Sequence, residues 1–335
     1  MRDDQQFEGL QIARALAALS VAYFHSKTML IGFPKDTAWP LPFIPTYGGQ
    51  GVHFFFAISG FVICLNAGRN MNWRQFLIRR AFRIYPLWIA AISLWCLVNP
   101  SLKPDSIEYI VRSILLLPIH GSFPLLDVGW SLQHEIAFYI VAAALAPFFG
   151  TVGIAIFLIT GWLAREHFDL PWWATEFTHY YPHFLAGILA YWMMEWLKRA
   201  GSLVPLFTGC LVFWYCARNN ADQLLFDVAY MLWIIGFVNM RVTSTLGKLG
   251  IELGNASYSI YLLHPIVFHV VHANFPHELP PAWTQEIIRF GALSATCLCA
   301  VFSFRFFERP INRFAKRNNR IRLAANPEQP FGHRL

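Results

Sequence analysis

Long apolar runs separated by short polar stretches recur along almost the whole chain. A helix that crosses a bilayer needs about 20 mainly apolar residues, and ten segments approach that length. Because no stretch between them could form a water-soluble domain of useful size, the pattern predicts an all-α polytopic membrane protein with about ten transmembrane helices. The segments expected to span are residues 10–31, 51–68, 84–99, 130–147, 150–165, 180–197, 203–218, 222–240, 255–274 and 284–307.

Two stretches fall outside this pattern. Residues 106–119 are apolar but too short to span, and they contain Glu108 and Arg112, so they are expected to form a helix at the outer membrane interface. Residues 311–335 are basic and are expected to form a cytoplasmic tail. The predicted organisation is therefore one transmembrane domain, residues 1–310, followed by this tail.

Composition agrees with a membrane protein whose partner is the lipid bilayer. Hydrophobic residues make up 56% of the 335 residues and charged residues only 13%, against roughly a quarter charged in soluble domains. The net charge of +7 could suggest a nucleic-acid binder, but cytoplasmic loops of membrane proteins carry an excess of Lys and Arg. With both termini in the cytoplasm, 18 of the 26 Lys and Arg residues lie inside. We therefore predict an N-in, C-in orientation and no nucleic-acid partner.

The first spanning segment contains two ionisable side chains, Arg14 and His25. They are 11 positions apart, which is about 20° beyond three full circles and roughly 16 Å along a helix. They therefore share one face. Ionisable groups inside a bilayer are costly and usually line a cavity, so both are candidate functional residues. The alternatives are that Arg14 snorkels to the inner interface and that His25 is only a packed core residue.

Arginines are concentrated just before the third predicted span. Arg80 and Arg83 are three residues apart and lie on one helix face, so their guanidinium groups could converge on a phosphate. The alternative is that these arginines only determine topology. In the segment before them, the small residues Ala57, Ser59 and Gly60 would let a neighbouring helix or a ligand approach closely.

Glu135 enters a spanning helix from the outer side in this topology, about five residues or roughly 8 Å below the boundary. His25 would lie at a similar depth, so the two side chains could meet. His134 points about 100° away on the same helix and is a poorer partner. Two other histidine groups, one at His179 and His183 and one beginning at His264, lack acidic or thiol ligands nearby, so no metal site is predicted.

Six sequence elements run in order over residues 14–310: Arg14 with ten residues before His25, GVxxFFxxSGF from Gly51, RRxxRIYP from Arg79, WSLxxExxFY from Trp130, SYSIYLLHP from Ser257 and FFERP from Phe306. Together these elements resemble the membrane acyltransferase-3 family, whose members O-acylate bacterial surface glycans. A family member commonly carries an acidic residue after the GV of the second element, where this chain has His53.

The resemblance implies a multi-pass enzyme of the bacterial inner membrane. It implies acyl-CoA, most commonly acetyl-CoA, as a donor substrate with no permanently bound cofactor, and a carbohydrate or glycolipid acceptor at the far side. It also implies that Arg14 and His25 are essential and that Arg80 and Arg83 serve the CoA end, and we group Tyr85 of the same element with them. Glycan-assembly proteins are expected partners.

The mechanism expected for such an enzyme is general-base catalysis. His25 would deprotonate the acceptor hydroxyl, because the ordinary pKa of an imidazole lies near neutrality. Glu135 would orient that imidazole and stabilise its protonated form. Ser59 is a candidate nucleophile, and direct transfer and an acyl-enzyme both stay open.

Two other functions would use the same sequence features differently. A transporter or flippase for a polar glycan or lipid-linked substrate would also need intramembrane Arg, His and Glu, but no CoA. The chain lacks the paired Gly or Pro helix breaks of many inverted-repeat transporters, which weighs against this interpretation. A structural partner in a glycan-export complex would leave Arg14 and His25 without a role.

Overall fold

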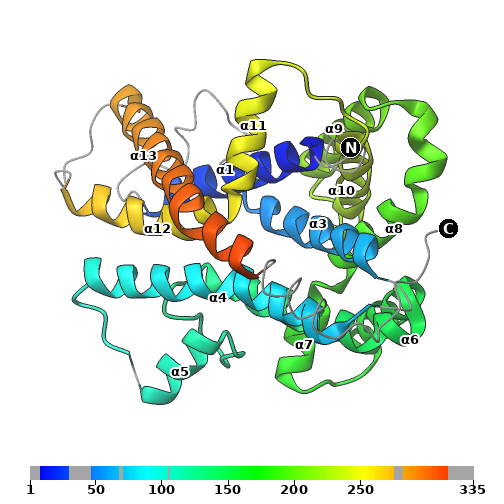
Figure 1. Ribbon diagram of the computed structural model, residues 1–335, viewed down its shortest axis with the longest axis horizontal. Coiled ribbons are helices and arrows are strands. Elements are labelled where there is room, and N and C mark those ends of the chain that lie inside the picture. Colours follow the sequence, from blue (N-terminus) through cyan, green and yellow to red (C-terminus); the bar gives the residue numbers. More distant parts are fainter. Residues whose placement is uncertain (1–7, 30–46, 68–70, 105, 275–281, 316–335) are drawn as a thin grey trace.

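The computed structural model describes residues 8–29, 47–67, 71–104, 106–274 and 282–315. Over these ranges the protein consists of helices joined by turns and short loops, with no β-strand (Figure 1). The predicted all-α class is therefore confirmed. The helices are α1 (Glu8–Met29), α3 (Gln50–Asn66), α4 (Trp73–Val98), α5 (Ile107–Leu115), α6 (Gly129–His167), α7 (Trp172–His179), α8 (Tyr181–Leu197), α9 (Leu203–Asn219), α10 (Gln223–Val238), α11 (Thr245–Asn255), α12 (Ser257–Asn274) and α13 (Ala282–Ser303).

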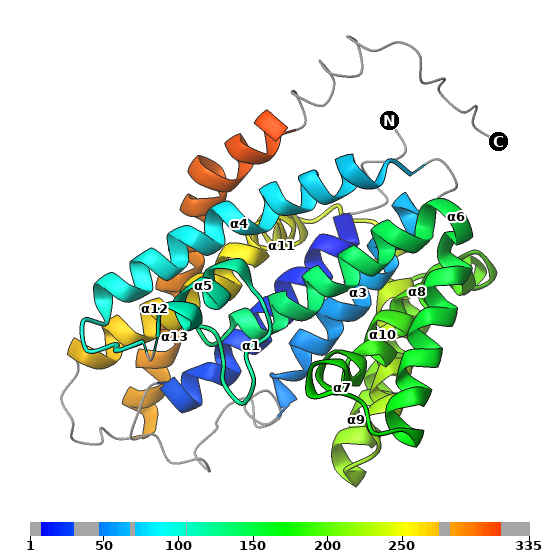
Figure 2. The ribbon, with the colours of Figure 1, turned by 90° about the horizontal axis from the view of Figure 1, so that it is seen from below.

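The first helix, α1, occupies the middle of the bundle. It packs against α3, α10, α11, α12 and α13, and it passes between the other helices in both views (Figures 1 and 2). Figure 2 shows α8, α9 and α10 on one side of it and α4, α12 and α13 on the other. The helix that carries Arg14 and His25 is thus surrounded by protein.

Small residues allow α3 and α8 to cross at close range. A side chain at Gly187 would lie 1.8 Å from the carbonyl oxygen of Ala57, and one at Gly60 would lie 2.1 Å from the carbonyl oxygen of Phe184. Neither glycine can be replaced without separating the helices. The prediction that Ala57 and Gly60 permit close approach is confirmed, and the neighbour is α8.

The arginine-rich segment is helical, which corrects one predicted boundary. The third span was expected to begin at residue 84, but α4 begins at Trp73, where the side chain of Asn72 accepts a hydrogen bond from the backbone N–H of Gln75. The apolar pattern did not reveal these first turns because arginines interrupt it. As a result Arg80 and Arg83 are fixed on the same rigid helix as the span itself.

Other boundaries agree more closely with the prediction. Helix α6 continues through residues 129–167 with a break at Gly150, whose φ of 62° is strained for any other residue, so two predicted spans correspond to its two halves. The short helix α11 was not predicted. Helix α13 continues through a π-turn at Phe304–Glu308 as far as Ala315, and residues 316–335 of the predicted tail lie outside the described residues.

Within the described ranges, three helices are long and apolar enough to cross a membrane: Trp73–Val98, Gly129–His167 and Thr284–Ala315. Two shorter apolar helices, Gln50–Asn66 and Gln223–Val238, accompany them. The count of ten spans, the N-in, C-in orientation and the interfacial position of α5 stay predictions.

Candidate functional site

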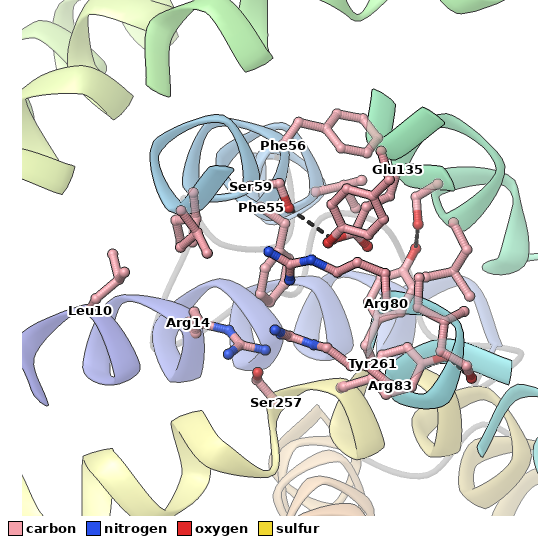
Figure 3. A pocket seen from close by; sticks show the side chains of 18 of the residues that line it. Leu10, Arg14, Phe55, Phe56, Ser59, Arg80, Arg83, Glu135, Ser257 and Tyr261 are labelled. Carbon is pink, nitrogen blue, oxygen red and sulfur yellow. Dashed lines mark hydrogen bonds between the residues drawn. The ribbon is translucent and has the colours of Figure 1, made fainter. Parts of the chain in front are cut away.

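A cavity of about 660 Å³ lies beside the first half of α1. Helices α1, α3, α4, α6 and α12 form its walls, so it sits where the two sides of the bundle meet (Figure 3). Its charged and hydroxyl-bearing lining residues are Arg14, Arg80, Arg83, Glu135, Ser59, Ser131, Tyr139, Ser257, Tyr258 and Tyr261.

Three arginines from two helices converge on this cavity. Arg14 projects from α1, and Arg80 and Arg83 project from α4 towards the same space (Figure 3). The Arg80 guanidinium lies 4.6 Å from the ring centre of Tyr139, which holds it over an aromatic face. Within the described residues none of the three forms an ion pair. Arg80 and Arg83 therefore line one cavity together with Arg14, and their binding of a phosphate stays a prediction.

A second hollow of about 400 Å³ continues from the same arginines. It shares Arg14, Arg80 and Arg83 with the first cavity and also contacts Arg79 and Glu308. Four guanidinium groups thus border two neighbouring hollows that share part of their lining. Planar guanidinium groups suit bidentate binding of phosphate oxygens, so this wall could hold a ligand that carries several phosphates.

Two carboxylates balance part of this positive charge. Glu135 accepts a hydrogen bond of 2.8 Å from the hydroxyl of Ser59 and a second from Tyr139. Glu308 accepts one from Ser259. Arg14 is attracted electrostatically to both carboxylates and is repelled by Arg83. A half-buried cation in such a position can bind a group that develops or carries negative charge.

His25 does not line this cavity. Its Nδ1 lies 2.8 Å from Nε2 of His264, which is fully buried. Tyr261 separates this imidazole pair from the cavity, since its ring lines the cavity and lies 6.0 Å from the ring of His264. Glu135 has Ser59 and Tyr139 as its hydrogen-bond partners. The expected contact between His25 and Glu135 is therefore not formed: His25 contacts His264, and Glu135 contacts the hydroxyls of α3 and α6.

Tyr85 also lies elsewhere than the sequence suggested. It does not line either hollow, and its hydroxyl donates a 3.0 Å hydrogen bond to the carbonyl of Leu115 at the end of α5. Its neighbour Ile84 contributes to the cavity wall instead. Tyr85 therefore attaches α5 to α4 and is separated from the three arginines that it was grouped with.

Several lining residues were not singled out from the sequence. Tyr258 and Tyr261 belong to the SYSIYLLHP element and Glu308 to FFERP, so the signal was present without a role for each residue. Tyr258 donates to the carbonyl of Ile84 at 2.8 Å and ties α12 to α4. Tyr261 shares a 2.8 Å hydrogen bond with Ser131 of α6.

A second polar group lies between α3, α8 and α10, and we call it the histidine cluster: His53, His183, Asp227, Gln50 and Tyr230. The imidazole of His183 lies 2.6 Å from a carboxylate oxygen of Asp227 and stacks on that of His53 with 4.4 Å between ring centres. His53 lies 2.7 Å from the amide oxygen of Gln50. Within the described residues, no three His, Cys, Asp or Glu side chains gather as metal ligands would.

Comparison with known proteins connects this geometry to a family. The chain is 27% identical to the exopolysaccharide production protein ExoZ of Rhizobium meliloti (strain 1021) over 80% of this chain and 90% of that protein. It is 23% identical to nodulation protein 10 of Rhizobium leguminosarum bv. viciae, over 78% and 83%. It is 24% identical to a putative acetyltransferase, ORF330, of Acidianus two-tailed virus, over 75% and 80%. No protein of known structure matches the chain.

The profile of the acyltransferase-3 family, described as an acyltransferase domain, matches residues 7–305. This range includes every helix that lines the larger cavity. The chain therefore belongs to the acyltransferase-3 family.

Proposed function

We propose that this protein is an integral membrane O-acyltransferase of the bacterial inner membrane. It moves an acyl group from cytoplasmic acyl-CoA to a hydroxyl of an extracytoplasmic carbohydrate such as exopolysaccharide or lipopolysaccharide. The acyl group we propose is acetyl. Membership of an acyltransferase family supports the transfer of an acyl group. The relative named for exopolysaccharide production supports a carbohydrate as the acceptor.

The observation that carries the proposal is the convergence of Arg14, Arg80 and Arg83 on one cavity without ion-pair partners in the described chain. Cations that lack fixed counter-charges in an apolar surrounding are costly unless a ligand neutralises them. CoA carries phosphate groups at one end and a thiol at the other. Its phosphates would bind Arg80 and Arg83, and its pantetheine arm would pass Arg14 towards Tyr261.

The chemistry proposed is transfer of the acyl group to a hydroxyl beside His25, which lies beyond the cavity on the far side of Tyr261, so the acyl group must pass Tyr261 to react. An imidazole nitrogen of His25 accepts the hydroxyl proton while the oxygen attacks the thioester carbon. The thiolate then leaves and takes the proton back from the imidazolium, so CoA departs as the thiol. Arg14 lies roughly 16 Å from His25 along α1, so it would bind negative charge on the CoA moiety beside Arg80 and Arg83 rather than the reacting thioester.

The first experiment measures acetyl-CoA binding to the purified, detergent-solubilised protein by calorimetry. The double variant Arg80→Ala/Arg83→Ala should bind at least about 100-fold more weakly than wild type, because each of the two charge-assisted contacts contributes about 1.5–3 kcal/mol. Arg74→Ala is the matched control, since Arg74 lies one turn or more away on α4 over the ring of Trp73 and lines neither hollow.

The second experiment measures transfer of labelled acetyl groups by protein reconstituted in liposomes. His25→Ala should bind acetyl-CoA normally and lose transfer activity. Full activity of His25→Ala would refute the general-base assignment. Absence of acetyl-CoA binding in folded wild-type protein would reject the enzyme in favour of a transporter that uses the same cavity.

A further inference from the structure

The contact between His25 and His264 fixes which nitrogen of each imidazole carries the proton. The two rings are nearly coplanar, with 5° between their planes. Their centres are 5.0 Å apart while the facing nitrogens, Nδ1 of His25 and Nε2 of His264, are 2.8 Å apart. The rings therefore meet edge to edge through a hydrogen bond between nitrogens, and one of those nitrogens must donate.

The backbone of α12 decides which one donates. The Nδ1 atom of His264 lies 3.1 Å from the carbonyl oxygen of Ile260, and a carbonyl oxygen can only accept. Nδ1 of His264 is therefore protonated, and Nε2 of the neutral ring carries the lone pair. It follows that Nδ1 of His25 donates to His264, which leaves Nε2 of His25 as its basic nitrogen.

The sequence around His264 explains why this arrangement is rigid. Pro265 has no N–H, so the carbonyl of Tyr261 loses its usual helical donor. His264 interacts with this freed carbonyl of Tyr261 and also with the carbonyl of Ile260. The ring is fully buried and packs against Phe268 at 5.7 Å between ring centres. Neither rotation of the ring nor the other tautomer is compatible with these contacts.

We propose that His264 is a positioning residue that holds His25 in the tautomer with a basic Nε2. This inference rests on the proposed function, in which His25 is the general base. The role resembles that of the carboxylate in other hydroxyl-activating pairs, which orients a histidine through its second ring nitrogen. Here a neutral imidazole anchored to the backbone takes that role, so orientation is supplied without adding a buried charge.

The test compares substitutions at His264 in the liposome transfer assay. His264→Phe keeps a ring but removes the acceptor, and it should lower kcat about 100-fold with the KM for acetyl-CoA within about twofold. His264→Gln restores an acceptor oxygen and should recover most of that loss. His269→Phe is the matched control, because His269 lies on the same helix against Trp95 and should keep normal activity.

A double variant separates this role from a general effect on folding. Adding His264→Phe to His25→Ala should reduce the residual activity no further, because the two residues act as one unit. If His25→Ala is inactive and His264→Phe is fully active, this inference is wrong and the proposed function stands. If His25→Ala is itself fully active, the general-base assignment and this inference fail together.

A spectroscopic measurement on the unaltered site decides the matter even if His264→Phe does not fold. Nitrogen-15 NMR of histidine-labelled wild-type protein in lipid distinguishes the two neutral tautomers, and the His25 signals are assigned by their loss in His25→Gln. A protonated Nδ1 in His25 supports the proposal. A protonated Nε2 with an unprotonated Nδ1 overturns it.

Discussion

Helix α3 carries two polar regions on different faces, and they differ in how their polar groups are satisfied. On one face Ser59 donates to Glu135 at the edge of a cavity that three arginines enter. On the other face His53 belongs to the histidine cluster, where His183 is only 2% exposed and bound to Asp227. The first region has a cavity and three arginines that form no ion pair in the described chain, whereas the polar side chains of the second bind one another.

This difference indicates what each region contributes. A buried polar group that already has partners contributes to the stability and specificity of helix packing. Cations that face a cavity without counter-charges contribute little to stability and are suited to a ligand. Substitutions at the cavity should therefore reduce activity and leave stability nearly unchanged, and substitutions in the histidine cluster should do the reverse.

Among single substitutions of residues that line the cavity, the largest effect on activity is expected for Arg14→Ala. It removes the cation that Glu135 and Glu308 both attract, so kcat/KM for acetyl transfer should fall about 100-fold, which corresponds to about 2.7 kcal/mol. The liposome transfer assay measures this, and Arg74→Ala again serves as the control. Unchanged kcat/KM would show that Arg14 does not take part in transfer. A lower melting temperature, with unfolding that accounts for the lost activity, would place Arg14 among the structural residues.

Asp227→Ala should show the opposite profile. It leaves the buried N–H of His183 without its acceptor and should lower stability by about 2 kcal/mol. Thermal melting of the solubilised protein measures this, and acetyl-CoA affinity should stay within about twofold of wild type. Asp227→Asn keeps an acceptor oxygen and should melt close to wild type. A loss of transfer activity without a loss of stability would mean that the histidine cluster belongs to the reaction.

The fold was predictable where burial in apolar surroundings dominates. Runs such as residues 203–218 and 222–240 match α9 and α10 within two residues at each boundary. The start of α4 was not predictable from hydropathy, because its first turns contain arginines that face the cavity or solvent. Helix α11 was missed because it has only 11 residues, with glycines and charged residues between its apolar ones, and because Gly254 fits against the backbone of α1 only in the folded bundle.

The relative positions of site residues were predictable where those residues lie on the same helix. The positions of Arg80 and Arg83 followed from a separation of three residues. The partner of His25 did not, because helical spacing places residues on a face but does not specify which of several helices covers it. His264 on α12 occupies the position expected for Glu135, and the pairing depends on how α1, α6 and α12 cross.

Ser59→Ala distinguishes support of Glu135 from covalent catalysis. If Ser59 only donates its 2.8 Å hydrogen bond to Glu135, its loss should cost about 1 kcal/mol and about fivefold in kcat. A nucleophile would instead lose about 1,000-fold or more. The transfer assay measures kcat for Ser59→Ala and Ser59→Thr together, since threonine keeps the hydroxyl. We expect the smaller effect, because the cavity places the hydroxyl against a carboxylate rather than a histidine.

The smallest effect is expected at Tyr85, although it stands two residues from Arg83 in the sequence. Its hydroxyl binds the carbonyl of Leu115, so Tyr85→Phe should leave acetyl-CoA affinity and kcat within about twofold of wild type. The same substitution at Tyr258, which lines both hollows and binds the carbonyl of Ile84, should weaken acetyl-CoA binding more. Calorimetry compares the two variants directly. Equal losses of acetyl-CoA affinity would show that contact with the cavity does not distinguish the two tyrosines. Weakening either attachment of α4 to a neighbouring helix would then disturb the site equally.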